Sequence, residues 1–218
     1  MATMRGIRCV LAAVALCGPA GAVFAVDAAA PNSVKAHSAL PAEPGVDSRR
    51  VLWGGWETAL QLGERVGPVQ TTPQCQQPGA REWSELLARR AGAELQQALD
   101  DELARAHYVP RNRSTLAPLE VSAVLNEYVQ NLCSTGNGHW HGGFYVQVTW
   151  KVRQAGSGKV LYQGTTRGSF ATAQPAERPP AYALRDAFAV AARNLLADKR
   201  FVATLQPRGT VATVASRD

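Results

Sequence analysis

Two histidines separated by one residue form a cluster whose side-chain types suggest a binding site. They are His139 and His141, in the segment GHWHGG at residues 138–143. On an extended segment alternate side chains point to the same face, so the two imidazoles would lie together, with Trp140 on the opposite face. Imidazole nitrogens bind Zn²⁺ and Cu²⁺. We expect a glycine-rich loop with two incidental histidines, and the alternative is a metal site formed by His139 and His141.

This pair lacks the further ligands that a complete metal site needs. A structural zinc site has four protein ligands, and a catalytic one has three with an open position. No third ligand adjoins His139 and His141 in the sequence. Metal binding or metal delivery is therefore the second hypothesis on function, behind one that needs no metal.

The sequence contains no motif of nucleophilic or metal-dependent catalysis. It has neither a Gly-x-Ser-x-Gly elbow nor a His-Glu-x-x-His helix. The string GSGK at residues 156–159 is not a phosphate-binding loop, because Arg153 stands at the first glycine position and Val160 at the Ser/Thr position. The acidic run Asp100-Asp101-Glu102 is expected on a solvated helix face. We expect no enzymatic activity and no cofactor.

The first 25 residues have the features of a secretory signal peptide. Two arginines precede the apolar run Cys9–Cys17, which is too short for a stable transmembrane helix. Small residues then allow cleavage after Ala25, with Ala22 as the alternative. We expect the chain in the periplasm, with no transmembrane segment once residues 1–25 are removed.

The cysteines bear on anchoring and on stability. Leu16 precedes Cys17 where a lipoprotein signal normally has Gly or Ala, so an outer-membrane lipid anchor is disfavoured. Cys75 and Cys133 remain after cleavage, and an even pair in an oxidising compartment predicts one disulfide. The chain-entropy model gives such a crosslink roughly 4 kcal/mol of stabilisation.

Composition divides the rest of the chain into a linker, a domain and a tail. Residues 26–49 are rich in Ala and Pro without an apolar period, which predicts a flexible linker. Residues 50–205 predict a single domain, and residues 206–218 a loose tail. Without residues 1–25 the net charge is about +4, and no basic block interleaved with aromatic residues favours a nucleic-acid partner.

Two helices are predicted from apolar residues that recur at helical spacing. The first runs from Glu82 to about Ala106, and the second from about Ala181 to Asp198. The apolar face of the first comprises Trp83, Leu86, Leu87, Ala91, Leu95, Leu99 and Leu103. That of the second comprises Leu184, Phe188, Ala191 and Leu195, with Phe201 and Leu205 anchoring the exit.

Three segments alternate between apolar and polar residues and predict strands. They are residues 119–126, 144–153 and 159–170, and the segment VLWGGW at residues 51–56 predicts a strand or a turn. A Pro-rich loop is expected at residues 174–180. The resulting fold class is α+β, with a small antiparallel sheet of three or more strands covered on one face by two helices. Trp150 lies at the centre of the clearest strand and is expected in the core.

The region from Trp83 to Leu205 resembles the YajG-like and ABC-transport auxiliary envelope lipoproteins. The strand–turn–strand VQVTWKVRQAGSGKVLYQGTTRGSF and the closing helix ALRDAFAVAARNLLADKRFVATL are similar to theirs in hydrophobic spacing. The resemblance implies an envelope accessory protein and carries over no catalytic residues. This chain departs from the pattern in its defective lipobox at Cys17 and in the pair Cys75 and Cys133.

The leading hypothesis on function is a non-enzymatic periplasmic accessory protein that binds an envelope partner. The sequence leaves open whether that partner is a protein, a lipid or a cell-wall polymer. The exposed edge of the sheet is one docking surface, because unpaired backbone groups there accept an added strand. The oligomeric state is not indicated by the sequence.

Overall fold

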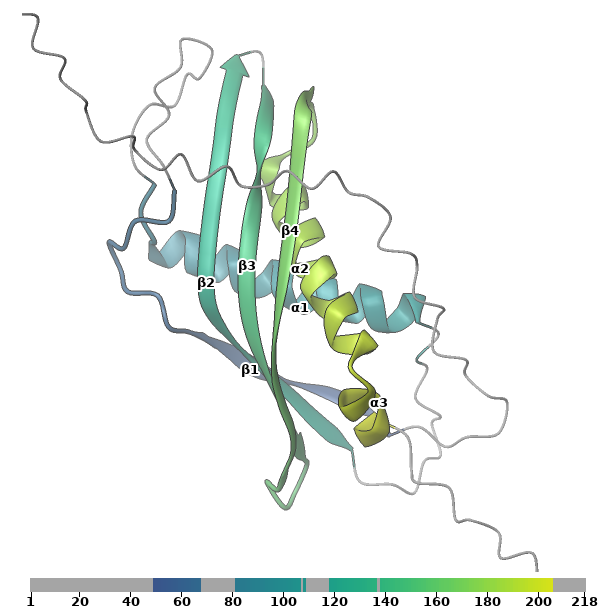
Figure 1. Cartoon of the computed structure of the whole chain (residues 1–218). Coiled ribbons are helices and arrows are strands. Elements are labelled where there is room, and N and C mark those ends of the chain that lie inside the picture. The colour runs from purple at the N-terminus through teal and green to yellow at the C-terminus, as the bar shows by residue number, and fades with distance from the viewer. Residues whose placement is uncertain (1–48, 68–80, 107, 109–117, 137, 206–218) are drawn as a thin grey trace, which may run out of the picture.

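The computed structural model describes residues 49–67, 81–106, 108, 118–136 and 138–205. The elements in chain order are β1 (Val51–Thr58), α1 (Glu85–Arg105), β2 (Leu119–Gly136), β3 (His139–Gln154), β4 (Val160–Ala176), α2 (Pro180–Ala197) and α3 (Lys199–Leu205). Helices pack against a four-stranded sheet, which confirms the α+β fold (Figure 1). The expected signal peptide, most of the linker and the tail lie outside the described residues.

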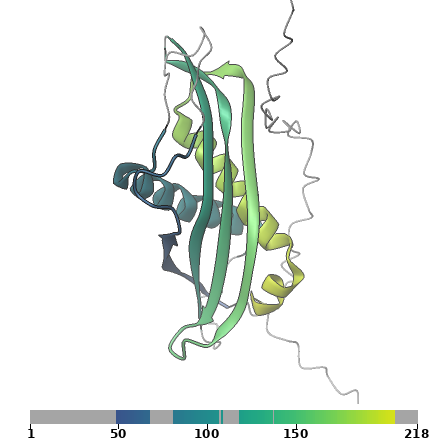
Figure 2. The ribbon, with the colours of Figure 1, turned by 60° about the vertical axis from the view of Figure 1, so that its left-hand side comes forward.

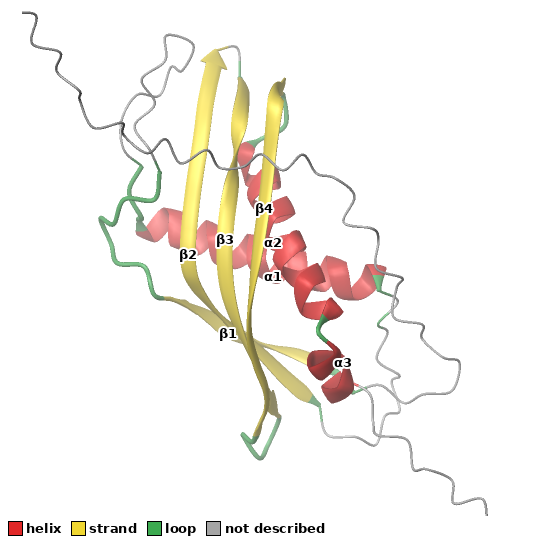
Figure 3. Cartoon of the chain, in the orientation of Figure 1, coloured by secondary structure: helices red, strands yellow, loops and turns green. Residues whose placement is uncertain are grey.

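The sheet is mixed, because an additional parallel strand joins the predicted antiparallel ones. The strand order is β1-β2-β3-β4, with antiparallel pairing of β2 with β3 and of β3 with β4. Strand β1 pairs with β2 in parallel, and α1 lies between these two strands in the chain (Figure 3). A parallel pair needs such a crossover, so the VLWGGW segment is an edge strand and not a turn.

Strands β2, β3 and β4 are 18, 16 and 17 residues long and extend beyond the predicted alternation. The expected loop around the histidines is wrong, since β3 begins at His139, and β4 continues to Ala176 into the expected Pro-rich loop. Pairing overrides the low strand propensity of glycine here. A Cβ atom at Gly142 would collide with the Asn131 carbonyl oxygen, so glycine permits this close strand contact.

Helix α1 begins at Glu85, where the Ser84 hydroxyl accepts a hydrogen bond from the Leu87 backbone N–H at 3.3 Å. Most of its predicted apolar face is buried, but Leu86 is 64% exposed, so its assignment to that face is wrong. With about 100° of rotation per residue, Leu86 lies about 140° around the helix from Ala91. Trp83 is buried ahead of the helix, in the segment that pairs with Glu64.

Helix α2 lies against β3 and β4, and its predicted apolar face is buried as expected. Phe201 and Leu205 are buried in the separate helix α3. Trp150 is fully buried, and its indole N–H donates to the Thr166 hydroxyl at 2.7 Å. At the end of α3, the Leu205 carbonyl oxygen accepts a hydrogen bond from the Arg49 N–H at 3.1 Å. The first and last described residues therefore meet.

The face of the sheet opposite the helices is called the open face here. Figure 2 shows the described helices on one side of the sheet, and no described element covers the other side. Polar side chains on the open face bond across strands: the Asn126 amide donates to the Thr149 hydroxyl at 2.7 Å, and the hydroxyls of Thr149 and Thr165 lie 2.8 Å apart. These bonds join β2, β3 and β4 on a solvated surface.

Candidate functional site

The two histidines lie on one side of β3, opposite Trp140, as the alternation predicts. Trp140 is buried, and its indole N–H donates to the Arg178 carbonyl oxygen at 2.6 Å. His139 and His141 are half-buried. The Nε2 atom of His139 lies 3.6 Å from Oε1 of Glu177, whose side chain is exposed. His139 therefore has an acidic neighbour from the segment that follows β4.

The described residues contain no group of three or more His, Cys, Asp or Glu side chains placed to hold a metal ion. Metal binding by His139 and His141 stays a prediction. Cys133 is buried on β2 across from His141, and Cys75 lies outside the described residues. The disulfide between the two cysteines likewise stays a prediction.

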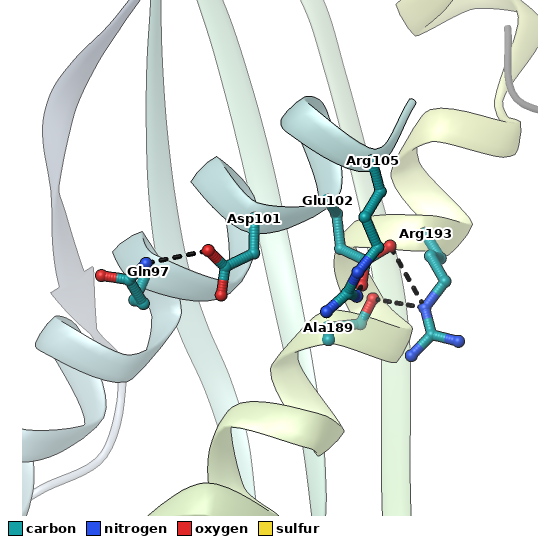
Figure 4. Close-up of polar contacts among 6 residues, drawn as sticks. All are labelled: Gln97, Asp101, Glu102, Arg105, Ala189 and Arg193. Carbon is teal, nitrogen blue, oxygen red and sulfur yellow. Dashed lines mark hydrogen bonds and ion pairs between the residues drawn. The ribbon is translucent and has the colours of Figure 1, made fainter. Parts of the chain in front are cut away.

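A polar cluster between α1 and α2 is centred on Glu102 (Figure 4). Glu102 is only 3% exposed, so its expected place on a solvated face is wrong. Its carboxylate pairs with Arg105 of the same helix and, at 3.4 Å, with Nε of Arg193 on α2. The same Nε of Arg193 lies 3.3 Å from the Ala189 carbonyl oxygen, to which it donates. Glu102 thus joins the two helices.

The spacing of Glu102 along α1 contains a signal for this burial. It follows Ala91, Leu95 and Ala98 at intervals of three and four residues, and all three are fully buried. Asp100 and Asp101 of the same acidic run stand at positions outside this spacing. The neighbouring Asp101 instead accepts a hydrogen bond from the Gln97 amide at 2.9 Å on an exposed surface.

A second ion pair connects the same two helices. Glu94 of α1 accepts a hydrogen bond from Nε of Arg185 on α2 at 2.6 Å. Glu94 and Glu102 are eight residues apart on α1, and their partners Arg185 and Arg193 are eight residues apart on α2. Eight residues correspond to about 12 Å along a helix axis. The acids lie on α1 and the arginines on α2, so the two pairs fix the register of the helices.

Burial raises the pKa of Glu102, and the nearby Asp101 raises it further, whereas Arg193 and Arg105 lower it. Removal from water therefore outweighs the two guanidinium groups, both of which lie on partly exposed side chains. Its ion-pair partners are arginines, which are neither nucleophiles nor general bases. The cluster links the helices and is not an acid–base pair.

The substitution Glu102→Gln is expected to raise the free energy of unfolding at neutral pH by about 1 kcal/mol or less, because burial disfavours the charged carboxylate and glutamine carries no charge. A carboxyl whose pKa is higher in the folded than in the unfolded state binds more protons when folded. The wild type therefore gains stability as the pH falls through the folded-state pKa. Glutamine does not titrate, so the difference should shrink on acidification. Urea melts at neutral and mildly acidic pH measure this.

Glu85→Gln is the matched control for this prediction, because it removes an exposed carboxylate from the same helix. It should cost only a few tenths of a kcal/mol through the helix dipole. A loss of stability at neutral pH in the Glu102→Gln variant, larger than that of the control, would contradict the prediction. It would mean that the ion pairs outweigh the burial cost.

The outer edge of β4 is an unpaired backbone surface of the sheet. Strand β4 ends the strand order and pairs only with β3 among the described elements. The Arg167 carbonyl oxygen accepts a hydrogen bond from the Asn194 side-chain amide at 2.8 Å, so this carbonyl points away from β3. Because backbone direction alternates, the N–H and C=O groups of Thr165 and Ser169 also point outward. Arg167 is the one charged residue in this strand.

No family model matches the chain, and no curated protein sequence matches it. A candidate lipoprotein from Caulobacter crescentus CB15 is 24% identical, with a TM-score of 0.31 over 49% of this chain and 77% of that one. A Xanthomonas campestris protein of family DUF330 is 12% identical, with a TM-score of 0.36 over 68% and 82% of the two chains. A hypothetical protein from Chlamydia trachomatis is 14% identical, with a TM-score of 0.27 over 57% and 73%.

Similarities this low assign the chain to no family. Among the described helices, none combines the length and the apolar character that crossing a membrane requires.

Proposed function

We propose that this protein is a non-enzymatic accessory protein of the cell envelope that binds an extended segment of a partner protein along the outer edge of β4. The envelope location is supported by the signal-peptide features of residues 1–25. The absence of catalytic motifs from the sequence supports a binding role. The observation that carries the proposal is the length and lack of protection of this edge.

Natural sheets usually protect their edges with charged residues, prolines, bulges or short strands. Strand β4 spans 17 residues with a single charged side chain, and its one proline, Pro175, stands next to its last residue. Its pairing with β3 is regular from Gly142 to Val152. One outward carbonyl, that of Arg167, is occupied by the Asn194 side chain. An added strand would pair with the other outward groups, which is how extended peptides bind to sheet edges.

The substitution Ser169→Pro is expected to abolish partner binding, because it removes an outward N–H group without changing the groups that bond to β3. The matched control is Ser169→Ala, which keeps the N–H group and removes only the hydroxyl. A photo-crosslinking amino acid at Gln163, an exposed β4 residue, would report the partner in intact cells. We expect a crosslinked protein in the wild type and in the alanine variant, and none in the proline variant.

A crosslink that survives the proline variant would refute docking by the backbone of β4. Crosslinks to lipid or to cell-wall polymer in place of protein would refute the proposed class of partner. The same crosslinker at Gln96, on the exposed surface of α1, is the control for nonspecific capture. Far-ultraviolet circular dichroism of each variant shows whether the sheet is intact.

A further inference from the structure

We propose that the open face of the sheet binds a second copy of this chain, which forms a twofold-symmetric dimer. This inference goes beyond the proposed function, because it concerns the face of the sheet and not its β4 edge. No described helix or strand covers this face (Figure 2). Its occupant is inferred from the distribution of charge over the four strands.

Charged side chains on the open face are segregated by strand. The acidic residues of the four strands all lie on β1 and β2, and the Lys and Arg residues all lie on β3 and β4. The acidic set is Glu57, Glu120 and Glu127, and the basic set is Lys151, Arg153 and Arg167. The alternation that buries their neighbours puts both sets on the face away from the helices. The face is therefore acidic on one half and basic on the other, with no net charge.

Two rows of paired residues cross the boundary between the halves. In one row, Glu127 of β2 pairs with Gln147 of β3, which pairs with Arg167 of β4. In the other, Glu120 pairs with Arg153. Tyr145 pairs with Val129 and with Ser169 and, like Gln147, alternates with the buried Phe144 and Val146, so it lies on the same face as these rows.

A twofold axis parallel to the strands matches this charge pattern. Two faces that pack about such an axis reverse the strand order and keep the position along the strands, so an axis between β2 and β3 places acidic β2 over basic β3 of the second copy, and β1 over its β4. Glu120 then faces Arg153 of the second copy, and Glu127 faces its Gln147. An axis perpendicular to the strands would place acidic strands over acidic strands, which is unfavourable. The pattern thus selects one of the two face-to-face dimers.

The composition and size of the open face also suit a protein interface. Val124 lies between the two charged rows, whereas Val129 and Tyr145, which pair with each other, lie beyond the row of Glu127; all three residues are half-buried. The open face thus mixes apolar, hydroxyl and charged side chains, as non-obligate protein interfaces do. Three strands of about 16 residues present roughly 750 Å² per copy, close to the area of a standard interface. Sheets pack face to face in this aligned way in β-sandwiches.

Sedimentation equilibrium of the purified protein and of two charge-reversed variants tests the dimer. The basic variant is Glu120→Lys with Glu127→Lys, and the acidic variant is Lys151→Glu with Arg153→Glu. Each variant alone should dissociate with a dissociation constant raised about tenfold or more, because like charges then face each other. An equimolar mixture of the two variants should form a heterodimer with affinity near that of the wild type. Thermal melts verify that each variant is folded.

A wild type that stays monomeric, or a dimer that neither variant weakens, would overturn the proposal. Folded variants that fail to associate when mixed would overturn it as well. Dimerisation only after deletion of residues 26–48 would overturn it by identifying that segment as the occupant of the open face. Both variants keep the outward N–H groups of β4 and should retain the crosslink from Gln163 to the partner protein, which mass spectrometry distinguishes from a crosslink to a second copy of this chain. The dimer and the β4-edge proposal can therefore fail separately.

Discussion

Replacing Trp150 with alanine should lower the free energy of unfolding by about 3–5 kcal/mol. The indole is fully buried at the centre of β3, across from Ala123 of β2 and Gly164 of β4. The substitution leaves a cavity between sheet and helices. It also removes the donor to the Thr166 hydroxyl, which itself donates to the Ala191 carbonyl oxygen at 2.8 Å. Chemical denaturation followed by circular dichroism measures the loss.

Lys151→Ala is the control for this prediction, because Lys151 is the next residue in β3 and projects to the open face. Its cost should be well under half that of Trp150→Ala. A larger loss for Lys151→Ala would mean that the core lies on the other face of the strand, since a shift of one residue exchanges the two faces.

The substitution Gly168→Ala should destabilise the protein by about 1–3 kcal/mol through overpacking. A Cβ atom at this position would collide with the Ala187 carbonyl oxygen and would lie 2.7 Å from the Ala191 nitrogen, both in the backbone of α2. Backbone atoms of a packed helix cannot move aside as a flexible side chain would. The added methyl group must therefore push α2 away from β4.

Ser169→Ala, one residue further along β4, is the matched control, because it alters the open face and leaves the contact with α2 untouched. It should change the stability by less than about 0.5 kcal/mol. Equal stability of the Gly168→Ala variant and the wild type in urea melts would show that α2 is not held against β4 as closely as the structure indicates.

Features of the fold that depend on local periodicity were predictable from the sequence. The alternation around Trp150 identified the buried face of β3, and the spacing of Leu184, Phe188, Ala191 and Leu195 identified that of α2. Each pattern places apolar residues on one face of a single helix or strand, and that face packs on the core. The core and the α+β class follow from such patterns.

Features that depend on pairing between distant segments were not predictable in the same way. Strand β1 is parallel to β2 because of how α1 returns the chain, and no residue in β1 encodes that direction by itself. The strand at His139 depends on contacts with β2 that only glycine at residue 142 permits. The burial of Glu102 depends on Arg193, which is 91 residues away in the sequence. The charge segregation of the open face emerges only when the strand order is known.

The hydrogen bond from the Arg49 N–H to the Leu205 carbonyl oxygen holds the two ends of the described fold side by side. Residues 1–48 enter the folded part, and residues 206–218 leave it, at one corner. Strand β2 begins beside Val51 at this corner and ends at Gly136, about 55 Å away along an extended strand (Figure 1). If the protein were tethered through its N-terminal segment, the β2–β3 end with His139 and His141 would reach furthest from the attachment point. The length of β2 and β3 would then set the distance between the attachment point and the two histidines.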